Sequence, residues 1–398
     1  MNILQVVDYF KPFWSSGGPA RVCYEIARRF ADMGHKVTIY SNGERRASEE
    51  KVIKNQPTTV DGMTVWYFKN LSSYLLNKTN IDSPYLLPII ARRKLREFDV
   101  IHIHTYRSVI TIPIWYYAKK YGIPYVLQAH GSVTTFFYKG WLKRIFDRLW
   151  GYKILKDAAK VIASTKTEAG QYKSMGVDEN KIEIVPYGIN LPEYENLPER
   201  GGFRRKYGLD DNERVVLYLG RIHRIKGLDL LAKAFAELSK DVDNVKLVFV
   251  GPDDGYLPSL KKLVGELKIN DKALFTGPLY GKDKLKAYVD ADIYVLPSFY
   301  ETFPNTVFEA CACGTPVILT DRCGIADVIN SRAGLVVPYD KERLQQALLR
   351  ILGDDKLRRE FGEKGKLMLR EKFNWEKIAN QIESIYSNCI LLKHKLRG

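Results

Sequence analysis

Cysteine is scarce in this sequence, with five residues in 398. A small and odd number does not fit the disulfide framework of a secreted protein and favours a reducing cytosol. No basic segment leads into an apolar stretch after Met1, so we expect no signal peptide. No uncharged apolar run reaches about 18 residues, so we expect no transmembrane helix. These absences favour a soluble cytoplasmic protein, and they are compatible with peripheral binding to the cytoplasmic face of the cell membrane.

Two ligand-binding motifs are also missing. The loop Ser15-Ser-Gly17-Gly18 is not a G-x-G-x-x-G fingerprint, and no acidic residue closes a second strand where a dinucleotide ribose would need it. Nicotinamide binding is therefore not expected. No Asp-x-Asp pair stands in a loop suited to a metal-bound diphosphate, and the adjacent Asp253 and Asp254 are expected to form a turn. We predict no metal site and no cofactor.

Positive charge is in excess and unevenly placed. The formal net charge is +16, and residues 1–190 contain 28 Lys and Arg against 16 Asp and Glu, a net of +12, so the remainder carries only +4. This imbalance indicates an anionic partner for the N-terminal half, such as a membrane surface, nucleic acid or an acidic acceptor. A generally basic proteome would produce the same excess.

Short β-branched runs alternate with amphipathic stretches, which predicts two doubly wound α/β units. The chain is also longer than one hydrophobic core usually fills. We expect a Rossmann-like domain over 1–190, a second over 200–372 after a linker near 187–208, and a terminal helix over about 375–398 that could pack back on the first. The expected strands are Ile3–Val7, Lys36–Ser41, Val65–Phe68, Val100–His104, Tyr125–Gln128, Lys160–Ser164, Lys181–Val185, Val215–Gly220, Lys246–Gly251, Ala273–Thr276, Ile293–Pro297, Val317–Thr320 and Leu335–Val337.

The segment from Pro297 to Pro316 carries the most informative pattern. A strand leads into a loop with Glu301, and the helix that follows contains Glu309 and ends at Gly314. Eight residues of helix rise about 12 Å, more than the roughly 5 to 9.5 Å between the carboxylates of a glycoside hydrolase. Because a carboxylate accepts two hydrogen bonds from vicinal hydroxyls, we expect one Glu to hold a ribose and the other a sugar.

This string resembles the E-x7-E motif of family 4 retaining glycosyltransferases, whose GT-B fold has two Rossmann-like doubly wound domains facing across a cleft. The carboxylate spacing, the Phe-Pro-Asn after Glu301 and the Gly-Thr-Pro exit occur in register. The resemblance implies that Glu301 contacts the transferred sugar and Glu309 the ribose. It implies acceptor binding in the first domain and a nucleotide-diphosphate sugar, UDP- or GDP-linked, in the second. It also implies a sugar, lipid-linked or polysaccharide acceptor, in surface polysaccharide or glycolipid synthesis.

A basic loop and a glycine pair follow two other strands. Cations beside a helix start, as in the loop from Gly220 to Gly227, suit a pyrophosphate. By the resemblance, Arg221 and Lys226 neutralise the departing diphosphate. Paired glycines let backbone N–H groups approach a phosphate or the acceptor, although a plain tight turn is the alternative.

A histidine after the strand Tyr125–Gln128 completes the expected site. The resemblance implies four catalytic residues: Glu301, His130, Arg221 and Lys226. Ligand-binding roles are implied for Gly17, Gly18, Arg221, Lys226, Gly277, Leu279, Thr302, Phe303, Asn305 and Glu309, with the glycine pair on the face of the cleft opposite the donor. His102 and His104 share a strand face and could form a metal pair, but no third ligand has a recognisable spacing, so we expect them to pack and to line the cleft.

Residues 136–156 predict an amphipathic helix, because Trp141, Ile145, Leu149 and Tyr152 recur at helical spacing between basic residues. Such a helix could lie in the headgroup region of an anionic membrane or pack its apolar stripe on the core. Two other functions stay open. A GT-B nucleotide-sugar hydrolase or epimerase would consume donor without acceptor, and a non-catalytic nucleic-acid-binding protein is suggested only by the basic charge.

Overall fold

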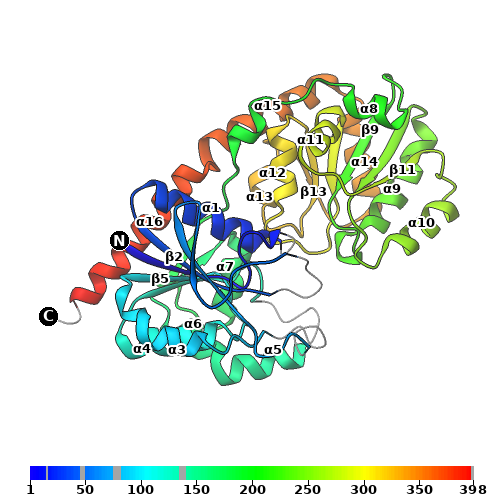
Figure 1. Cartoon of the computed structure of the whole chain (residues 1–398). Coiled ribbons are helices and arrows are strands. Elements are labelled where there is room, and N and C mark those ends of the chain that lie inside the picture. Colours follow the sequence, from blue (N-terminus) through cyan, green and yellow to red (C-terminus); the bar gives the residue numbers. More distant parts are fainter. Residues whose placement is uncertain (15–16, 45–49, 75–81, 134–139, 396–398) are drawn as a thin grey trace. The chain divides into compact units, whose positions relative to one another are not determined.

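The computed structural model describes residues 1–14, 17–44, 50–74, 82–133 and 140–395 (Figure 1). The chain divides into two compact units. The first unit comprises Met1–Tyr187 and Trp375–Gly398, and the second comprises Gly188–Asn374. Each contains one mainly parallel sheet flanked by helices, so the predicted α/β class with two Rossmann-like domains is confirmed.

The first unit is built on an eight-stranded sheet of order β3-β4-β2-β1-β5-β6-β7-β8. All neighbours pair in parallel except β3 and β4. Its strands are β1 (Asn2–Val6), β2 (Lys36–Asn42), β3 (Pro57–Val60), β4 (Met63–Phe68), β5 (Val100–Ile103), β6 (Tyr125–Gln128), β7 (Lys160–Ala163) and β8 (Ile182–Ile184). Its helices are α1 (Gly18–Asp32), α3 (Leu87–Lys94), η2 (Leu95–Glu97), α4 (Thr111–Tyr121), α5 (Gly140–Phe146), η3 (Asp147–Gly151), α6 (Tyr152–Asp157), α7 (Lys166–Ser174), η4 (Glu179–Lys181) and α16 (Trp375–Lys395).

Strand β3 was not expected from the sequence. It forms an antiparallel edge hairpin with β4, and its residues alternate between exposed and half-buried. The two residues between the strands, Asp61 and Gly62, both have positive φ angles, 47° and 77°. An Asp-Gly pair between two strands favours this tight turn, so the signal was present in the sequence.

Helix α16 belongs to the first unit although the 187 residues of the second unit, Gly188–Asn374, separate it in sequence from the rest of the first unit. The Tyr386 hydroxyl lies 2.6 Å from His102 Nδ1, and its ring contacts Phe30 with centroids 5.3 Å apart. Glu383 Oε1 lies 2.7 Å from His35 Nε2. The apolar residues at helical spacing in this segment therefore pack against α1 and β5.

The second unit is built on a six-stranded parallel sheet of order β11-β10-β9-β12-β13-β14. Its strands are β9 (Arg214–Leu219), β10 (Val245–Val250), β11 (Ala273–Gly277), β12 (Ile293–Leu296), β13 (Val317–Thr320) and β14 (Gly334–Val337). Its helices are η5 (Leu191–Tyr194), α8 (Gly202–Tyr207), η6 (Arg224–Lys226), α9 (Leu228–Asp241), α10 (Leu257–Glu266), α11 (Gly281–Asp290), α12 (Asn305–Ala312), α13 (Ala326–Ile329), α14 (Lys341–Leu352) and α15 (Asp355–Lys372). The strand order reverses between β9 and β12, where ligands bind in this architecture.

The loops after β9 and β12 meet backbone to backbone at Gly227. This residue has a φ angle of 64°, and a Cβ atom built on it would lie 2.0 Å from the carbonyl oxygen of Pro297. Nearby, the Phe299 N–H donates to the Ile225 carbonyl at 2.9 Å. Only glycine fits here, because both the backbone angle and the contact exclude a side chain.

We expect Gly227→Ala to lower the free energy of unfolding by about 3 kcal/mol or more, since strain in φ adds to a backbone displacement. Gly208→Ala is the matched control, because Gly208 has a φ angle of 66° but nothing within 4 Å of its Cβ position. It should cost only about 1 to 2 kcal/mol. Urea unfolding of both variants measures the difference, and equal losses would contradict the close contact.

Candidate active site

The predicted residues of the second unit gather at the carboxyl edge of its sheet. Arg221 follows β9, Gly277 closes β11, and Glu301 lies in the loop after β12. Because the strands are parallel, these loops emerge on the same edge of the sheet. Residues up to 80 positions apart in the sequence are thereby brought to one surface.

An ion pair between Lys226 and Glu301 lies at the point where the strand order reverses. Lys226 Nζ donates to Glu301 Oε2, and the two side chains are only 15% and 19% exposed. The backbone of Glu301 is fixed as well, because its carbonyl accepts from the Gly324 N–H at 2.8 Å. An ammonium group has three N–H donors, so Lys226 can hold Glu301 and still bind an anion.

Glu309 lies on α12 and has its own partners. Its Oε1 accepts from Lys284 Nζ at 2.9 Å and its Oε2 from the Tyr288 hydroxyl at 3.0 Å. Both partners come from α11. The two glutamates of the motif are thus held by different elements.

Arg221 is the more exposed of the two predicted cations. Its guanidinium group is 63% exposed and forms an ion pair with Asp254. The neighbouring Asp253 accepts from the N–H groups of Tyr256 and Leu257, both at 3.0 Å. The two aspartates therefore shape a turn and hold Arg221.

The other predicted donor contacts lie around the same edge. The Phe303 ring is buried and packs on Phe308 with centroids 4.9 Å apart, so its side chain belongs to the core. Asn305 is the first residue of α12. Gly277 is the last residue of β11, and Leu279 and Thr302 lie in the loops after β11 and β12; all three are half-buried.

His130 is held in a strained backbone conformation in the first unit, with a φ angle of 51°. Its Nδ1 lies 2.7 Å from the Tyr187 hydroxyl and its Nε2 lies 3.1 Å from His104 Nδ1. Burial lowers the pKa of His130 to about 3, so its imidazole is neutral at physiological pH. The following loop is anchored by Glu168, whose Oε1 accepts from the Gly131 N–H at 2.5 Å.

His102 and His104 belong to the same buried network. His104 Nε2 lies 2.5 Å from Gln5 Oε1, and the two imidazole centroids are 3.8 Å apart. Burial lowers the pKa of both histidines well below the usual value. No group of three His, Cys, Asp or Glu side chains suited to a metal ion occurs in the part of the chain that the structure describes.

Comparison with known proteins assigns the chain to a family. Residues 199–368 match the model of the group 1 glycosyl transferases, and residues 16–193 match that of glycosyltransferase family 4. A D-inositol 3-phosphate glycosyltransferase of Nocardia farcinica is 30% identical over 77% of this chain and 70% of its own length. The chain belongs to the family 4 glycosyltransferases.

Two whole-length matches agree with this assignment. An uncharacterized glycosyltransferase of Methanocaldococcus jannaschii is 26% identical over 93% of this chain and 94% of its own. The crystal structure of Anabaena HepE in complex with UDP and glucose superimposes with a TM-score of 0.77 and 17% identity, covering 98% of this chain and 100% of that one. The fold of this glycosyltransferase is therefore GT-B.

The predicted glycine pair of the glycosyltransferase lies at the start of α1. Gly17 is the N-cap residue, with a φ angle of 97°, and Gly18 is the first helical residue. A Cβ atom at either position would meet nothing within 4 Å. Gly17 is exposed and Gly18 is half-buried. Ser15 and Ser16 lie outside the described residues.

Two carboxyl groups at the carboxyl edge of the first unit were missed from the sequence. Asp8 follows β1 and accepts from Thr105 Oγ1 at 2.7 Å. Asp82 accepts from the Tyr9 hydroxyl at 3.2 Å. Burial, with a contribution from the Asp8 charge, raises the pKa of Asp82 to about 7. The position of Asp8 directly after the first strand was the one signal available; nothing local marks Asp82.

The predicted amphipathic helix is described from Gly140 onward, as α5, η3 and α6. Its stripe is not part of the core: Trp141 is 64% exposed, Ile145 47%, Leu149 48% and Tyr152 52%. Residues 136–139 of the prediction lie outside the described residues. No helix in the described ranges is long and apolar enough to cross a membrane.

Proposed function

We propose that this glycosyltransferase moves a sugar from a nucleotide-diphosphate sugar to a hydroxyl acceptor with retention of anomeric configuration. The observation that carries the proposal is the Lys226–Glu301 pair at the point where the sheet of the second unit reverses its strand order. A cation for the diphosphate and a carboxylate for the sugar hydroxyls stand side by side there. The UDP and glucose bound to HepE support a UDP-linked donor, with a GDP-linked one as the alternative.

In this proposal the second unit stabilises charge that grows on the leaving diphosphate. Lys226 and Arg221 donate to its oxygens, and Lys226 keeps its contact with Glu301 through another N–H. Arg221 either leaves its partner Asp254 for the diphosphate or binds both at once. Glu301 is engaged by Lys226 and holds the sugar instead of attacking it. As the bond from the anomeric carbon to the diphosphate breaks, the acceptor oxygen forms its bond to that carbon on the same face, and the leaving phosphate takes the acceptor proton.

Glu309 and the β11 loop bind the nucleoside in this proposal. Lys284 and Tyr288 each occupy one oxygen of Glu309 and fix the carboxylate. Each oxygen keeps a lone pair for a ribose hydroxyl. Backbone atoms from Gly277 to Leu279 meet the base. In the first unit, His130 is neutral and brings no charge to the reaction.

Lys226→Ala and Glu301→Ala should each lower kcat by a factor of about 10² to 10³, because each removes a charged contact made in the transition state. A thermal-shift screen of nucleotide diphosphates and nucleotide sugars first identifies the donor, since a bound ligand stabilises the fold. Transfer to acceptor is then measured for both variants.

The matched control is Lys206→Ala, which breaks an ion pair with Asp283 on the surface of the same unit. It should keep the wild-type rate. Wild-type rates in both site variants would refute the assignment. Equal turnover of the donor with and without acceptor would favour a hydrolase or epimerase instead.

We expect the reaction to need no divalent metal, because guanidinium and ammonium groups take the place of a metal ion at the diphosphate. Dialysed enzyme in excess chelator should keep its full rate of transfer. Loss of activity in chelator, restored by Mn²⁺ or Mg²⁺, would contradict this expectation.

We further propose that the enzyme binds peripherally to an anionic membrane through the apolar stripe of α5, η3 and α6. Transfer to a lipid-linked or surface-glycan acceptor would require such binding. The four stripe side chains are about half exposed, and Arg144 and Arg148 are exposed among them. Apolar side chains that enter the headgroup region beside basic residues stabilise such binding.

Trp141→Ser with Leu149→Ser should weaken binding to vesicles that contain phosphatidylserine by about tenfold or more, because both apolar contacts are lost. Co-sedimentation measures the binding. Tyr280→Ser, which removes a 75% exposed aromatic ring from the second unit, is the control. Unchanged binding of the double variant, or no preference for anionic vesicles, would contradict the proposal.

A further inference from the structure

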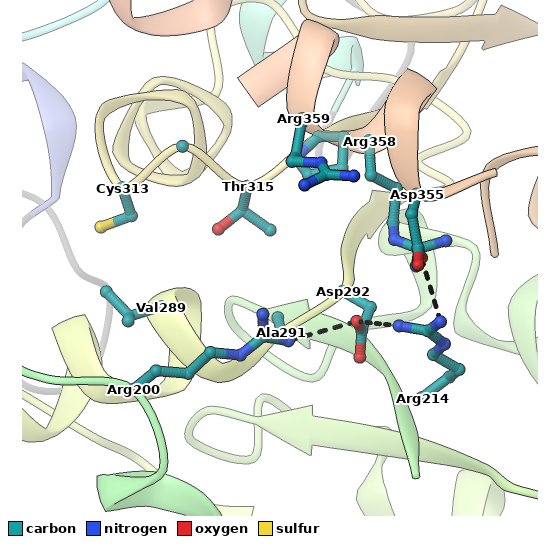
Figure 2. Close-up of a pocket in the computed structure, with 12 residues that line it drawn as sticks. Arg200, Arg214, Val289, Ala291, Asp292, Cys313, Thr315, Asp355, Arg358 and Arg359 are labelled. Carbon is teal, nitrogen blue, oxygen red and sulfur yellow. Dashed lines mark hydrogen bonds and ion pairs between the residues drawn. The ribbon is translucent and has the colours of Figure 1, made fainter. Parts of the chain in front are cut away.

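A cavity of about 320 Å³ opens in the second unit, away from the candidate active site (Figure 2). Its size is at the lower end of the range for small-molecule pockets. None of the predicted site residues lines it. The lining consists of Arg200, Arg214, Val289, Ala291, Asp292, Cys313, Gly314, Thr315, Pro316, Asp355, Arg358 and Arg359.

The cavity lies at the amino edge of the sheet. Arg214 is the first residue of β9, Asp292 directly precedes β12, and Thr315 and Pro316 directly precede β13. In a parallel sheet the amino and carboxyl ends of the strands lie on opposite edges. Six residues of strand span about 17 Å, so the cavity is separated by the length of β9 from the loop that carries Arg221.

Arginine is in excess over carboxylate in this cavity, with four against two. Asp292 is already saturated: it accepts from Arg200 at 3.3 Å and from Arg214 at 3.2 Å. It also accepts from Arg204 at 3.1 Å and from the Val215 N–H at 2.9 Å. The dashed lines of Figure 2 mark two of these contacts. One carboxylate is thus shared among three guanidinium groups, and a net positive charge remains.

Helix α15 adds to this charge. It presents Arg358 and Arg359 in its first turn, and Arg214 reaches its Asp355 at 3.0 Å. Burial lowers the pKa of Arg358, and the neighbouring Arg214 charge lowers it further. This repulsion between cations is what a bound anion would relieve. The positive end of the helix dipole acts in the same direction.

Arg359 is the cation most available to a ligand. It is exposed, and no ion pair is recorded for it among the residues that the structure describes. In Figure 2 its guanidinium group lies beside Thr315, on the opposite side of the cavity from Arg200. A ligand between them would meet guanidinium groups from two sides, a geometry suited to the oxygens of a phosphate.

We propose that this cavity is a binding site for a small molecule that bears a phosphate group, separate from the donor site, with Arg200, Arg214 and Arg359 binding the phosphate. Two of these side chains are partly exposed to solvent in the structure, Arg200 at 61% and Arg214 at 37%. Their N–H groups can therefore turn to a ligand without leaving a buried donor unpaired.

The test measures binding of inorganic pyrophosphate to the full chain by isothermal titration calorimetry. Arg221→Ala with Lys226→Ala first removes the candidate donor site as a competing anion site. In that background Arg200→Gln with Arg359→Gln should weaken pyrophosphate binding at least tenfold. Asp292 keeps its bonds from Arg204 and Arg214 in this variant, so the fold should be retained, and Arg359→Gln alone is the fallback because its side chain is exposed.

Arg343→Gln with Arg350→Gln is the matched control, because it removes the same charge from exposed positions of α14. It should bind pyrophosphate like its parent. Undetectable binding in the Arg221→Ala, Lys226→Ala background would overturn the proposal, and so would equal loss in the α14 control. A wrong donor-site assignment would give a different result. Arg221→Ala with Lys226→Ala would then leave pyrophosphate binding unchanged, while the cavity variants would still lose it.

Discussion

The candidate site in the second unit of this glycosyltransferase depends on the ion pair between Lys226 and Glu301. Both side chains are more than four-fifths covered, and loss of one partner would leave the other charge poorly solvated and unpaired. The pair ties the loop after β9 to the loop after β12. The close approach of Gly227 to the Pro297 carbonyl brings those loops together, so the glycine and the ion pair are parts of one arrangement.

The fold could be predicted from sequence because most strands are buried on both faces. Such strands appear as short continuous apolar runs, and helices fit between them. β3 differs because Pro57–Val60 is a half-exposed edge strand, and its only signal was the turn at Asp61 and Gly62. The position of α16 on the first unit depends on contacts such as Tyr386 with Phe30, which join the two ends of the chain and have no local signature.

The motif residues of the site were identifiable because parallel strands bring their following loops to one edge. Their partners were not. Asp254, Lys284 and Tyr288 lie on segments whose proximity to Arg221 and Glu309 is a result of tertiary packing. The burial of His102 and His104 could not be predicted from the sequence either. Their alternation on one strand is compatible with a metal pair, and only their hydrogen bonds to Tyr386 and Gln5 place them in a polar core.

The two edges of the sheet in the second unit differ in how their cations are paired with carboxylates. At the carboxyl edge three cations have a carboxylate partner, in the pairs Lys226–Glu301, Arg221–Asp254 and Lys284–Glu309. In the proposed reaction a diphosphate binds Lys226 and Arg221, while Glu301 and Glu309 keep their partners and accept from sugar and ribose hydroxyls with their remaining lone pairs. Such a site favours ligands that carry both an anion and hydroxyl groups. At the amino edge three guanidinium groups share Asp292, so an anionic charge alone is sufficient for attraction.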